Sequence, residues 1–201
     1  MVCVTRTKTS KPDALRSYLS MDPTAENYDC TVWEAASATA AAPMFFEGVK
    51  FQRRGEQWCD GGLRRNNPIN EALSEVARER EWKDRKIGCV LSIGTGTTKI
   101  SAVSSNLAGI LKDAVAIMTD AEDITRVFAA SELGKQMFRT HRYFRFNVPQ
   151  GMQDLQLDDW KETERMNALT SDYLSQTANG DMIVQCSKSL LDPDESREFS
   201  H

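Results

Sequence analysis

Short apolar runs along the chain predict β-strands. The first run, Val2 to Thr5, opens the sequence, and another is expected to end at Trp58-Cys59. The run Ile87 to Ile93 is rich in valine, leucine and isoleucine and is bounded by Gly94-Thr95-Gly96, a pattern typical of a strand buried on both faces. A further run, Tyr143 to Val148, mixes aromatic and β-branched residues, which favours a strand.

Apolar residues at helical spacing predict helices between these strands. Thr31 and Glu34 form the S/T-x-x-E pattern of a capping box, and the alanine-rich segment after them is expected to be helical as far as Ala42, because Pro43 stops it. A helix is also expected from Pro68. Its apolar face is Ile69, Ala72, Leu73, Val76 and Ala77. Later helices are expected over Leu107 to Met118, Ile124 to Phe138, Met166 to Tyr173 and Ile183 to Leu191.

The mixture of strands and helices predicts an α/β fold. A strand buried on both faces is typical of a parallel sheet, because the connections between parallel strands cover both faces with helices. No repeat or low-complexity linker divides the sequence. We therefore expect residues 1–201 to form one α/β unit with a mainly parallel sheet flanked by helices.

Charge and cysteine content narrow the function classes. The 25 basic and 29 acidic side chains leave a net charge of -4, so there is no basic field to hold nucleic-acid phosphates. The five cysteines are widely spaced and form no C-x-x-C pair, which suits reduced thiols in an intracellular compartment. The two histidines, His141 and His201, lie far from any cysteine, so no metal site or other cofactor is expected.

The amino terminus and the hydropathy pattern bear on location. No charged leader precedes an apolar segment, and no window approaches the roughly 18 apolar residues of a membrane span. We expect a cytoplasmic protein that meets lipid, where it does so, from the water side as a peripheral contact. Because the chain opens almost at once on a strand, we also expect an incomplete sheet on the amino-terminal side.

Several motifs in a fixed order resemble one known family. They are Trp33-Glu34-Ala35-Ala36, Ala40-Ala41-Ala42-Pro43-Met44-Phe45-Phe46, Asp60-Gly61-Gly62-Leu63, Asn66-Asn67-Pro68 and Leu91-Ser92-Ile93-Gly94-Thr95-Gly96. In wording and order these blocks resemble the patatin-like phospholipases. The resemblance is best over about residues 1–100 and weaker from Tyr143 onward. It implies that residues 1–201 are the carboxyl-terminal part of a patatin-like catalytic domain.

The resemblance implies a role for Asp60. Family members hydrolyse acyl esters of phospholipids and related lipids with a serine and an aspartate, and Asp60 matches that aspartate. It would accept the serine proton and return it to the leaving alcohol. Gly61 and Gly62 would keep side chains away from the acyl group or the serine, while Asn66 and Asn67 would cap the next helix and hold the loop. An isolated Asp-Gly-Gly predicts only a tight turn, but the flanking blocks favour the catalytic interpretation.

The serine of that pair has no counterpart in the chain. No G-x-S-x-G sequence occurs, and the glycine-rich oxyanion loop is also absent. Ser37 and Ser92 lack the flanking glycines of a nucleophile elbow, and His141 is expected to be an ordinary surface or strand-edge residue. In the family both missing segments lie upstream of the matching blocks, so we expect that they have been cut off.

Two functions remain open from the sequence. The first is a part of a lipid acyl hydrolase that is inactive alone, with a phospholipid or other acyl lipid as the substrate of the intact domain. The second is a non-catalytic remnant that binds lipid or a protein partner.

Overall fold

The computed structural model describes residues 1–43, 45–51, 55–79, 82, 85–97, 121–155 and 158–191. They fall into two compact units, which are described separately. Unit 1 holds the described residues from Met1 to Arg85 together with Ala121, and unit 2 holds the other described residues. Met44 and the helix predicted over Leu107 to Met118 lie outside the described residues. One domain over residues 1–201 stays a prediction.

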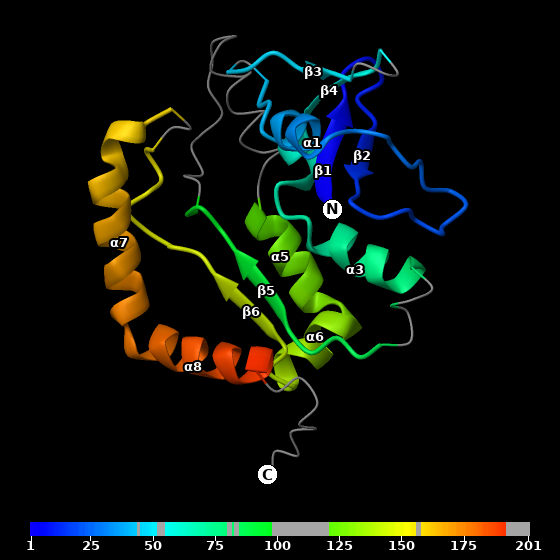
Figure 1. Ribbon diagram of the computed structural model, residues 1–201. Coiled ribbons are helices and arrows are strands. Elements are labelled where there is room, and N and C mark those ends of the chain that lie inside the picture. Colours follow the sequence, from blue (N-terminus) through cyan, green and yellow to red (C-terminus); the bar gives the residue numbers. More distant parts are fainter. Residues whose placement is uncertain are drawn as a thin grey trace. The chain divides into compact units, whose positions relative to one another are not determined.

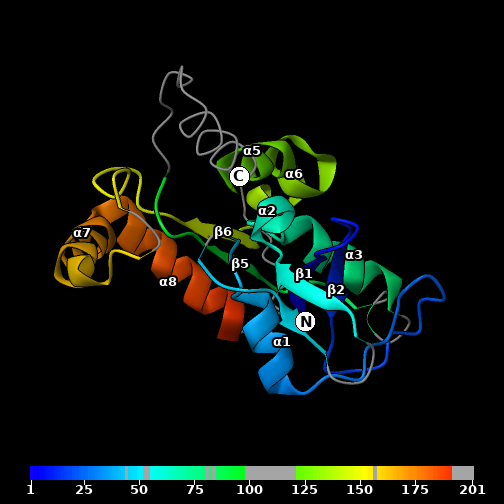
Figure 2. The same cartoon turned by 90° about the horizontal axis from the view of Figure 1, so that it is seen from above.

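Unit 1 is built on a four-stranded antiparallel sheet in the order β2-β1-β4-β3 (Figure 1). Within this unit, α1 lies on one side of the sheet and α2 and α3 lie on the other (Figure 2). Strand β1 pairs with β2 through Val2 and Leu15, and with β4 through Val4 and Asp60. The elements are β1 (Val2–Arg6), β2 (Pro12–Leu15), α1 (Val32–Thr39), β3 (Val49–Lys50), β4 (Gln57–Asp60), α2 (Gly62–Arg65) and α3 (Ile69–Arg78).

The start of α1 confirms the predicted capping box. The Thr31 hydroxyl accepts a hydrogen bond from the Glu34 backbone N–H at 3.1 Å, and the Glu34 carboxylate accepts one from the Thr31 N–H at 2.8 Å. The helix ends at Thr39, before the predicted end at Ala42. Beyond it the carbonyl of Ala41 accepts the backbone N–H of Asp60 at 3.0 Å. This bond to a neighbouring strand replaces a further helical turn.

The core of unit 1 lies between α1 and the sheet. Trp58 and Val4 are fully buried there, and Ala38 of α1 packs against them. The small side chain at Ala38 allows the helix to approach the sheet closely, as the alanine-rich pattern predicts. Trp58 also stacks on Phe51 with ring centres 5.5 Å apart and meets Tyr28 edge-on at 5.0 Å.

Helix α3 buries Ile69 and Glu75, and its C-cap residue, Glu79, is also buried. Of its predicted apolar face, Ile69 is buried, but Ala72 is exposed. The Glu75 carboxylate accepts hydrogen bonds from two N–H groups of Arg16, one of them at 2.8 Å, and from the Tyr18 hydroxyl at 2.9 Å. Glu79 accepts bonds from the Ser20 hydroxyl and, at 3.2 Å, from the Met21 N–H. These partners make the burial of both carboxylates tolerable.

The Glu75 contacts predict a loss of stability in acid. The hydrogen bond from Arg16 holds the pKa of Glu75 below its ordinary value of 4.5, against the opposing effect of burial. A carboxyl whose pKa is lowered by folding stabilises the protein above its unfolded pKa, and that stabilisation is lost as the pH falls through the folded pKa. Glu75→Gln should therefore cost about 1.5–3 kcal/mol near neutral pH. The cost should shrink below about pH 4.5.

Urea unfolding at a series of pH values would measure this difference. Glu132→Gln serves as the control, because Glu132 is 87% exposed and pairs with Lys135 on its own helix. A Glu75→Gln cost that stays constant from pH 7 to pH 3 would contradict the assigned ion pair.

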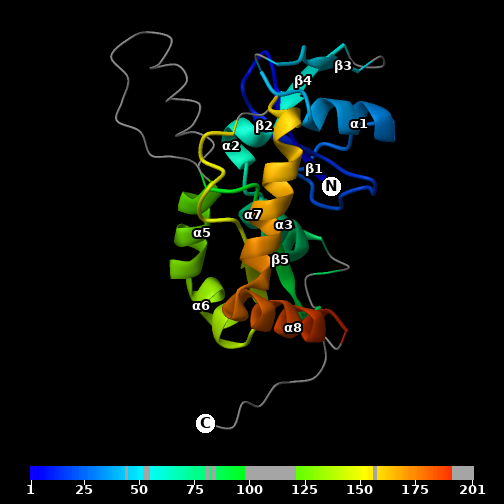
Figure 3. The same cartoon turned by 90° about the vertical axis from the view of Figure 1, so that its left-hand side faces the viewer.

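Unit 2 is built on two parallel strands. Val90 of β5 pairs with Tyr143 of β6, and this pair of strands lies between α5–α6 and α7–α8 (Figure 2). Helices α7 and α8 meet at a sharp bend (Figures 1 and 3), where Gln176 adopts an extended backbone. The elements are β5 (Val90–Ile93), α5 (Ala121–Ala130), α6 (Glu132–Arg139), β6 (Tyr143–Phe146), a 3-10 helix η1 (Trp160–Glu162), α7 (Thr163–Ser175) and α8 (Thr177–Leu191).

Two sequence predictions for unit 2 need correction. The strand predicted over Ile87 to Ile93 begins only at Val90, and it is not buried on both faces, since Leu91 is 43% and Ile93 73% exposed. The helix predicted to run to Phe138 is two helices, because the Ser131 hydroxyl caps a new one by accepting the Gly134 N–H at 3.0 Å.

Helices packed on sheets in both units agree with the α/β class. A mainly parallel sheet is not confirmed: among the described residues the larger sheet is antiparallel and the parallel one has two strands. Whether two strands pair parallel or antiparallel depends on contacts between segments that are distant in the sequence. The apolar pattern of one strand does not contain this information.

Candidate functional site

Asp60 lies at the carboxyl end of β4, on the side of the sheet that faces α1. It is two residues beyond Trp58 and directly opposite Val4, and both positions put its side chain on the face that carries the core. Its backbone N–H donates to the Ala41 carbonyl, and its Oδ1 accepts the Gly62 N–H at 2.7 Å. The strand, the exit from α1 and the start of α2 therefore all fix this half-buried carboxylate.

The two carboxylate oxygens of Asp60 differ in their contacts among the described residues. Among the described residues, no hydrogen bond or ion pair engages Oδ2. Asp13, in the same sheet, is different: its Oδ2 receives the Arg6 guanidinium at 2.9 Å and the Tyr28 hydroxyl at 2.7 Å. Asp13 is therefore occupied structurally, while Asp60 retains an oxygen that can accept a proton.

Gly61 is required by close packing rather than by its backbone angles. Its φ of -72° suits any residue, but a Cβ on Gly61 would lie 2.6 Å from the backbone carbon and oxygen of Cys3. The absent side chain makes room for β1. The predicted room for an acyl group or a serine stays a prediction. A Cβ on Gly62 would lie 3.2 Å from Asp60 Oδ1. Both glycines therefore keep the Asp60 turn tight against its neighbours.

The two asparagines lie beyond α2. Asn66 is exposed and ends α2. Asn67 is buried, with its Oδ1 3.4 Å from the Ile69 N–H at the start of α3 and its Nδ2 donating to the Ala121 carbonyl at 3.2 Å. The N-cap of α3 is Pro68 and has no side-chain cap hydrogen bond, so the predicted capping of this helix by Asn66 and Asn67 is not confirmed. Their role in holding the Asp60 loop stays a prediction.

The thiols nearest to Asp60 are poor nucleophiles. Burial raises the pKa of Cys59, and the negative charge of Asp60 raises it further. Burial also raises the pKa of Cys3, with a smaller opposing effect from Arg65. Reactivity at sulfur needs the thiolate, so neither residue is suited to replace the family's serine.

The hydroxyl and imidazole groups weighed from the sequence have structural surroundings. Ser37 lies within α1, and the Ser92 hydroxyl accepts a hydrogen bond from Arg145 at 3.0 Å. His141 adopts a positive φ of 49°, and its carbonyl accepts the Ser189 hydroxyl at 2.9 Å. Ser20 does contact a carboxylate, that of Glu79, but both residues are buried and tie a loop to α3.

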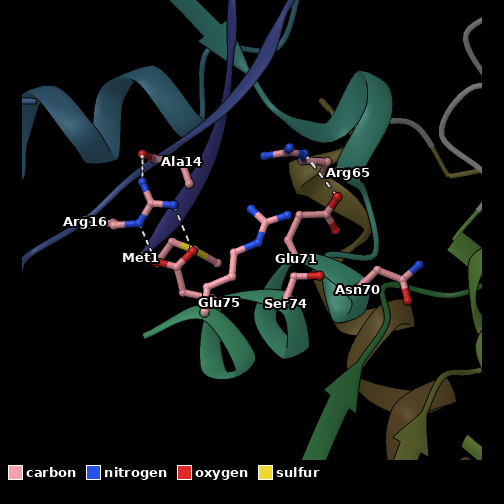
Figure 4. Close-up of a pocket in the computed structure, with 9 residues that line it drawn as sticks. Met1, Ala14, Arg16, Arg65, Asn70, Glu71, Ser74 and Glu75 are labelled. Carbon is pink, nitrogen blue, oxygen red and sulfur yellow. Dashed lines mark hydrogen bonds and ion pairs between the residues drawn. The ribbon is translucent and has the colours of Figure 1, made fainter. Parts of the chain in front are cut away.

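A polar pocket of about 170 Å³ lies on the opposite side of the same sheet (Figure 4). Arg16 and Glu75 form one of its walls, and Arg65 and Glu71 form another. Its other lining residues are Met1, Ala14, Asn70, Ser74 and Arg78. Ala14 alternates with Asp13 along β2, which puts the pocket on the α3 face, whereas Asp60 faces α1. The pocket is therefore distinct from the Asp60 site.

The described ranges contain neither a metal-ligating cluster nor a membrane-spanning helix. Among these residues, no three His, Cys, Asp or Glu side chains form a group that could hold a metal ion. None of the helices in the described part of the chain is long and apolar enough to cross a membrane.

Comparisons with known proteins agree with the motifs. The family model "Patatin-like phospholipase" matches residues 2–73, a range that includes Asp60 and both asparagines. Patatin-like phospholipase 1 of Plasmodium falciparum is 30% identical over 177 residues, covering 75% of this chain and 25% of that protein. Phospholipase A I of Arabidopsis thaliana is 30% identical over 128 residues, covering 64% of this chain and 9% of that protein. Calcium-independent phospholipase A2-gamma of Rattus norvegicus is 27% identical over 180 residues, covering 81% of this chain and 22% of that protein.

These matches confirm the predicted family: the chain belongs to the patatin-like phospholipases. It spans a quarter or less of the length of these curated relatives.

Proposed function

We propose that this chain is the carboxyl-terminal part of the catalytic domain of a patatin-like lipid acyl hydrolase, with Asp60 as its general base. The observation that carries the proposal is the state of the Asp60 carboxylate. One oxygen is fixed by the Gly62 N–H at 2.7 Å, while the other is left free of partners among the described residues. The family match over residues 2–73 and the relatives named phospholipases support the same conclusion.

The chemistry would be phospholipase A-type ester hydrolysis by a Ser-Asp pair. The serine is proposed to lie in a segment outside this sequence. Asp60 removes the proton from the serine hydroxyl as the serine oxygen bonds to the ester carbonyl carbon, and the proton then passes to the departing alcohol. Water hydrolyses the acyl-enzyme in the reverse sense, releasing the fatty acid and restoring the serine. No metal takes part in this scheme.

The same proposal would account for the exposed side chains of β5. We infer that β5 and β6 form part of a larger, mainly parallel sheet, which would cover the exposed side chains of Leu91 and Ile93. The expected partners are a phospholipid or another acyl lipid and, peripherally, the membrane surface. Nucleic acid is not an expected partner, and the expected location is the cytoplasm.

Activity measurements on the chain with and without a serine segment test the proposal. The 201-residue chain alone should hydrolyse short-chain nitrophenyl esters no faster than its Asp60→Ala variant, because neither contains the nucleophile. Joined to a family segment with the glycine-rich loop and G-x-S-x-G, the chain should release fatty acid from phospholipid. A fold of the joined protein verified by circular dichroism, combined with no fatty acid release, would refute the proposed hydrolase.

A non-catalytic binding module is the second candidate. It is favoured by aromatic side chains that the unit 1 core leaves uncovered, such as Trp33, 70% exposed, and Phe46, 64% exposed. Sedimentation with phospholipid vesicles separates the two functions. Vesicle binding by the chain alone, without turnover in the joined protein, would favour the binding module.

A further inference from the structure

Arg65 links the end of α2 to two other parts of unit 1. Its Nη1 donates to the backbone carbonyl of Asp13 in β2 at 3.1 Å, and its Nε pairs with Glu71 of α3 at 3.1 Å. The side chain is 20% exposed, so these contacts are shielded from solvent. One guanidinium therefore holds α2 to the strand β2 and to the helix α3.

The opposite end of α2 carries the Asp60 turn. The helix begins at Gly62, whose N–H donates to Asp60 Oδ1, and the Arg65 N–H donates to the Gly61 carbonyl at 2.9 Å. Gly61 in turn packs against the backbone of Cys3 in β1. One end of this single helical turn is thus fixed to β1, and the other end is fixed through Arg65 to β2 and α3.

We propose that Arg65 is a positioning residue for Asp60. It acts by holding α2 at the depth and orientation in which the Gly62 N–H meets Asp60 Oδ1. Without Arg65, the turn keeps the Gly61 contact but loses its anchor at the end of α2, so Asp60 Oδ1 loses its fixed donor for part of the time. Asp60 itself faces the other side of the sheet, so Arg65 does not touch the reacting atoms. The functional meaning of this arrangement rests on the proposed function of Asp60.

Hydrogen exchange in the 201-residue chain tests the positioning role. In Arg65→Gln, the Gly62 amide should exchange about tenfold faster than in the parent, measured relative to amides that open only on global unfolding. Arg65→Lys should restore part of the protection, because an ammonium can keep the Glu71 contact but not the complete set. Glu71→Gln removes only the charge of one partner and should give a smaller acceleration at Gly62.

Arg16→Gln is the matched control. Arg16 is also a half-buried arginine of unit 1 with a glutamate partner on α3, but its contacts among the described residues are with Glu75 and the Ala14 carbonyl rather than with α2. It should lower the global stability without a specific effect at Gly62. Equal acceleration in both variants, or normal Gly62 protection in a folded Arg65→Gln, would overturn the proposal. If Arg65→Gln does not fold, the same criterion applies to Glu71→Gln.

A kinetic arm connects the turn to catalysis. In the chain joined to a serine segment, Arg65→Gln should lower kcat roughly ten- to a hundredfold with little change in KM, because a misplaced base slows the chemical step more than it weakens substrate binding. Absence of turnover in the joined parent would count against the proposed function alone, since the exchange result does not depend on catalysis. A lower kcat without faster Gly62 exchange would count against the positioning role.

Discussion

In the chain joined to a segment that carries the nucleophilic serine, replacing Asp60 with asparagine should lower turnover by roughly 10²–10⁴-fold, the usual contribution of a positioned general base. Asparagine retains an oxygen that can accept the Gly62 N–H, so the turn should keep its shape. It cannot take up the proton of the attacking serine. The expected loss therefore lies in kcat, and release of fatty acid from phospholipid vesicles would measure it.

Asp13→Asn is the control for this experiment. Asp13 is another carboxylate of the same sheet, but Arg6 and Tyr28 already occupy it. Its replacement should weaken unit 1 and leave turnover per folded molecule nearly unchanged, as judged by circular dichroism and by activity normalised to the folded fraction. Near-parent turnover in a folded Asp60→Asn protein would reduce Asp60 to a turn residue.

Features fixed by local chemistry were predictable from the sequence. The capping box at Thr31 and Glu34 formed because both hydrogen bonds are made within one helical turn. The helices α7 and α8 appeared near their predicted positions, since their apolar spacing is sustained over many residues. The same pattern could not give the end of α1, because that end depends on a hydrogen bond from Asp60 to Ala41.

Strand pairing was the least predictable part of the fold. Strand β2, Pro12–Leu15, has a proline and an aspartate, which are uncommon in strands, and it was not predicted. The proline is tolerated because β2 is an edge strand and Pro12 is its first residue, where a missing N–H costs little. Its partner in the sheet, β1, was predicted correctly, but a strand's own sequence does not state the direction of its neighbour.

The candidate site divides in the same way. Asp60, Gly61 and Gly62 could be singled out from the sequence, because the Asp-Gly-Gly turn motif lies within three consecutive residues. The reason for Gly61 was not visible, since the atom it must avoid belongs to Cys3, far away in the sequence. Arg65 was also missed, because its contacts with Asp13 and Glu71 exist only once the sheet and α3 have assembled.

Trp58→Ala should destabilise unit 1 by about 3–5 kcal/mol, the usual cost of truncating a buried aromatic side chain. The side chain is fully buried and packs against the rings of Phe51 and Tyr28. Arg6 also lies over the indole, with its guanidinium carbon 5.2 Å from the ring centre. Against a total stability of about 5–15 kcal/mol, this loss would leave the unit marginal. Urea unfolding followed by circular dichroism would measure it.

Two further tryptophan variants make the test specific to the core. Trp33→Ala should cost less than about 0.5 kcal/mol, because Trp33 belongs to the same unit but is 70% exposed. Trp58→Phe should cost far less than Trp58→Ala, since phenylalanine keeps most of the ring volume. It also removes an indole N–H that is buried without a hydrogen-bond partner among the described residues. Similar losses for Trp58→Ala and Trp33→Ala would mean that Trp58 does not organise this core. Because Trp58 lies two residues before Asp60 on β4, a loosened core should also accelerate exchange of the Gly62 amide, in proportion to the stability lost.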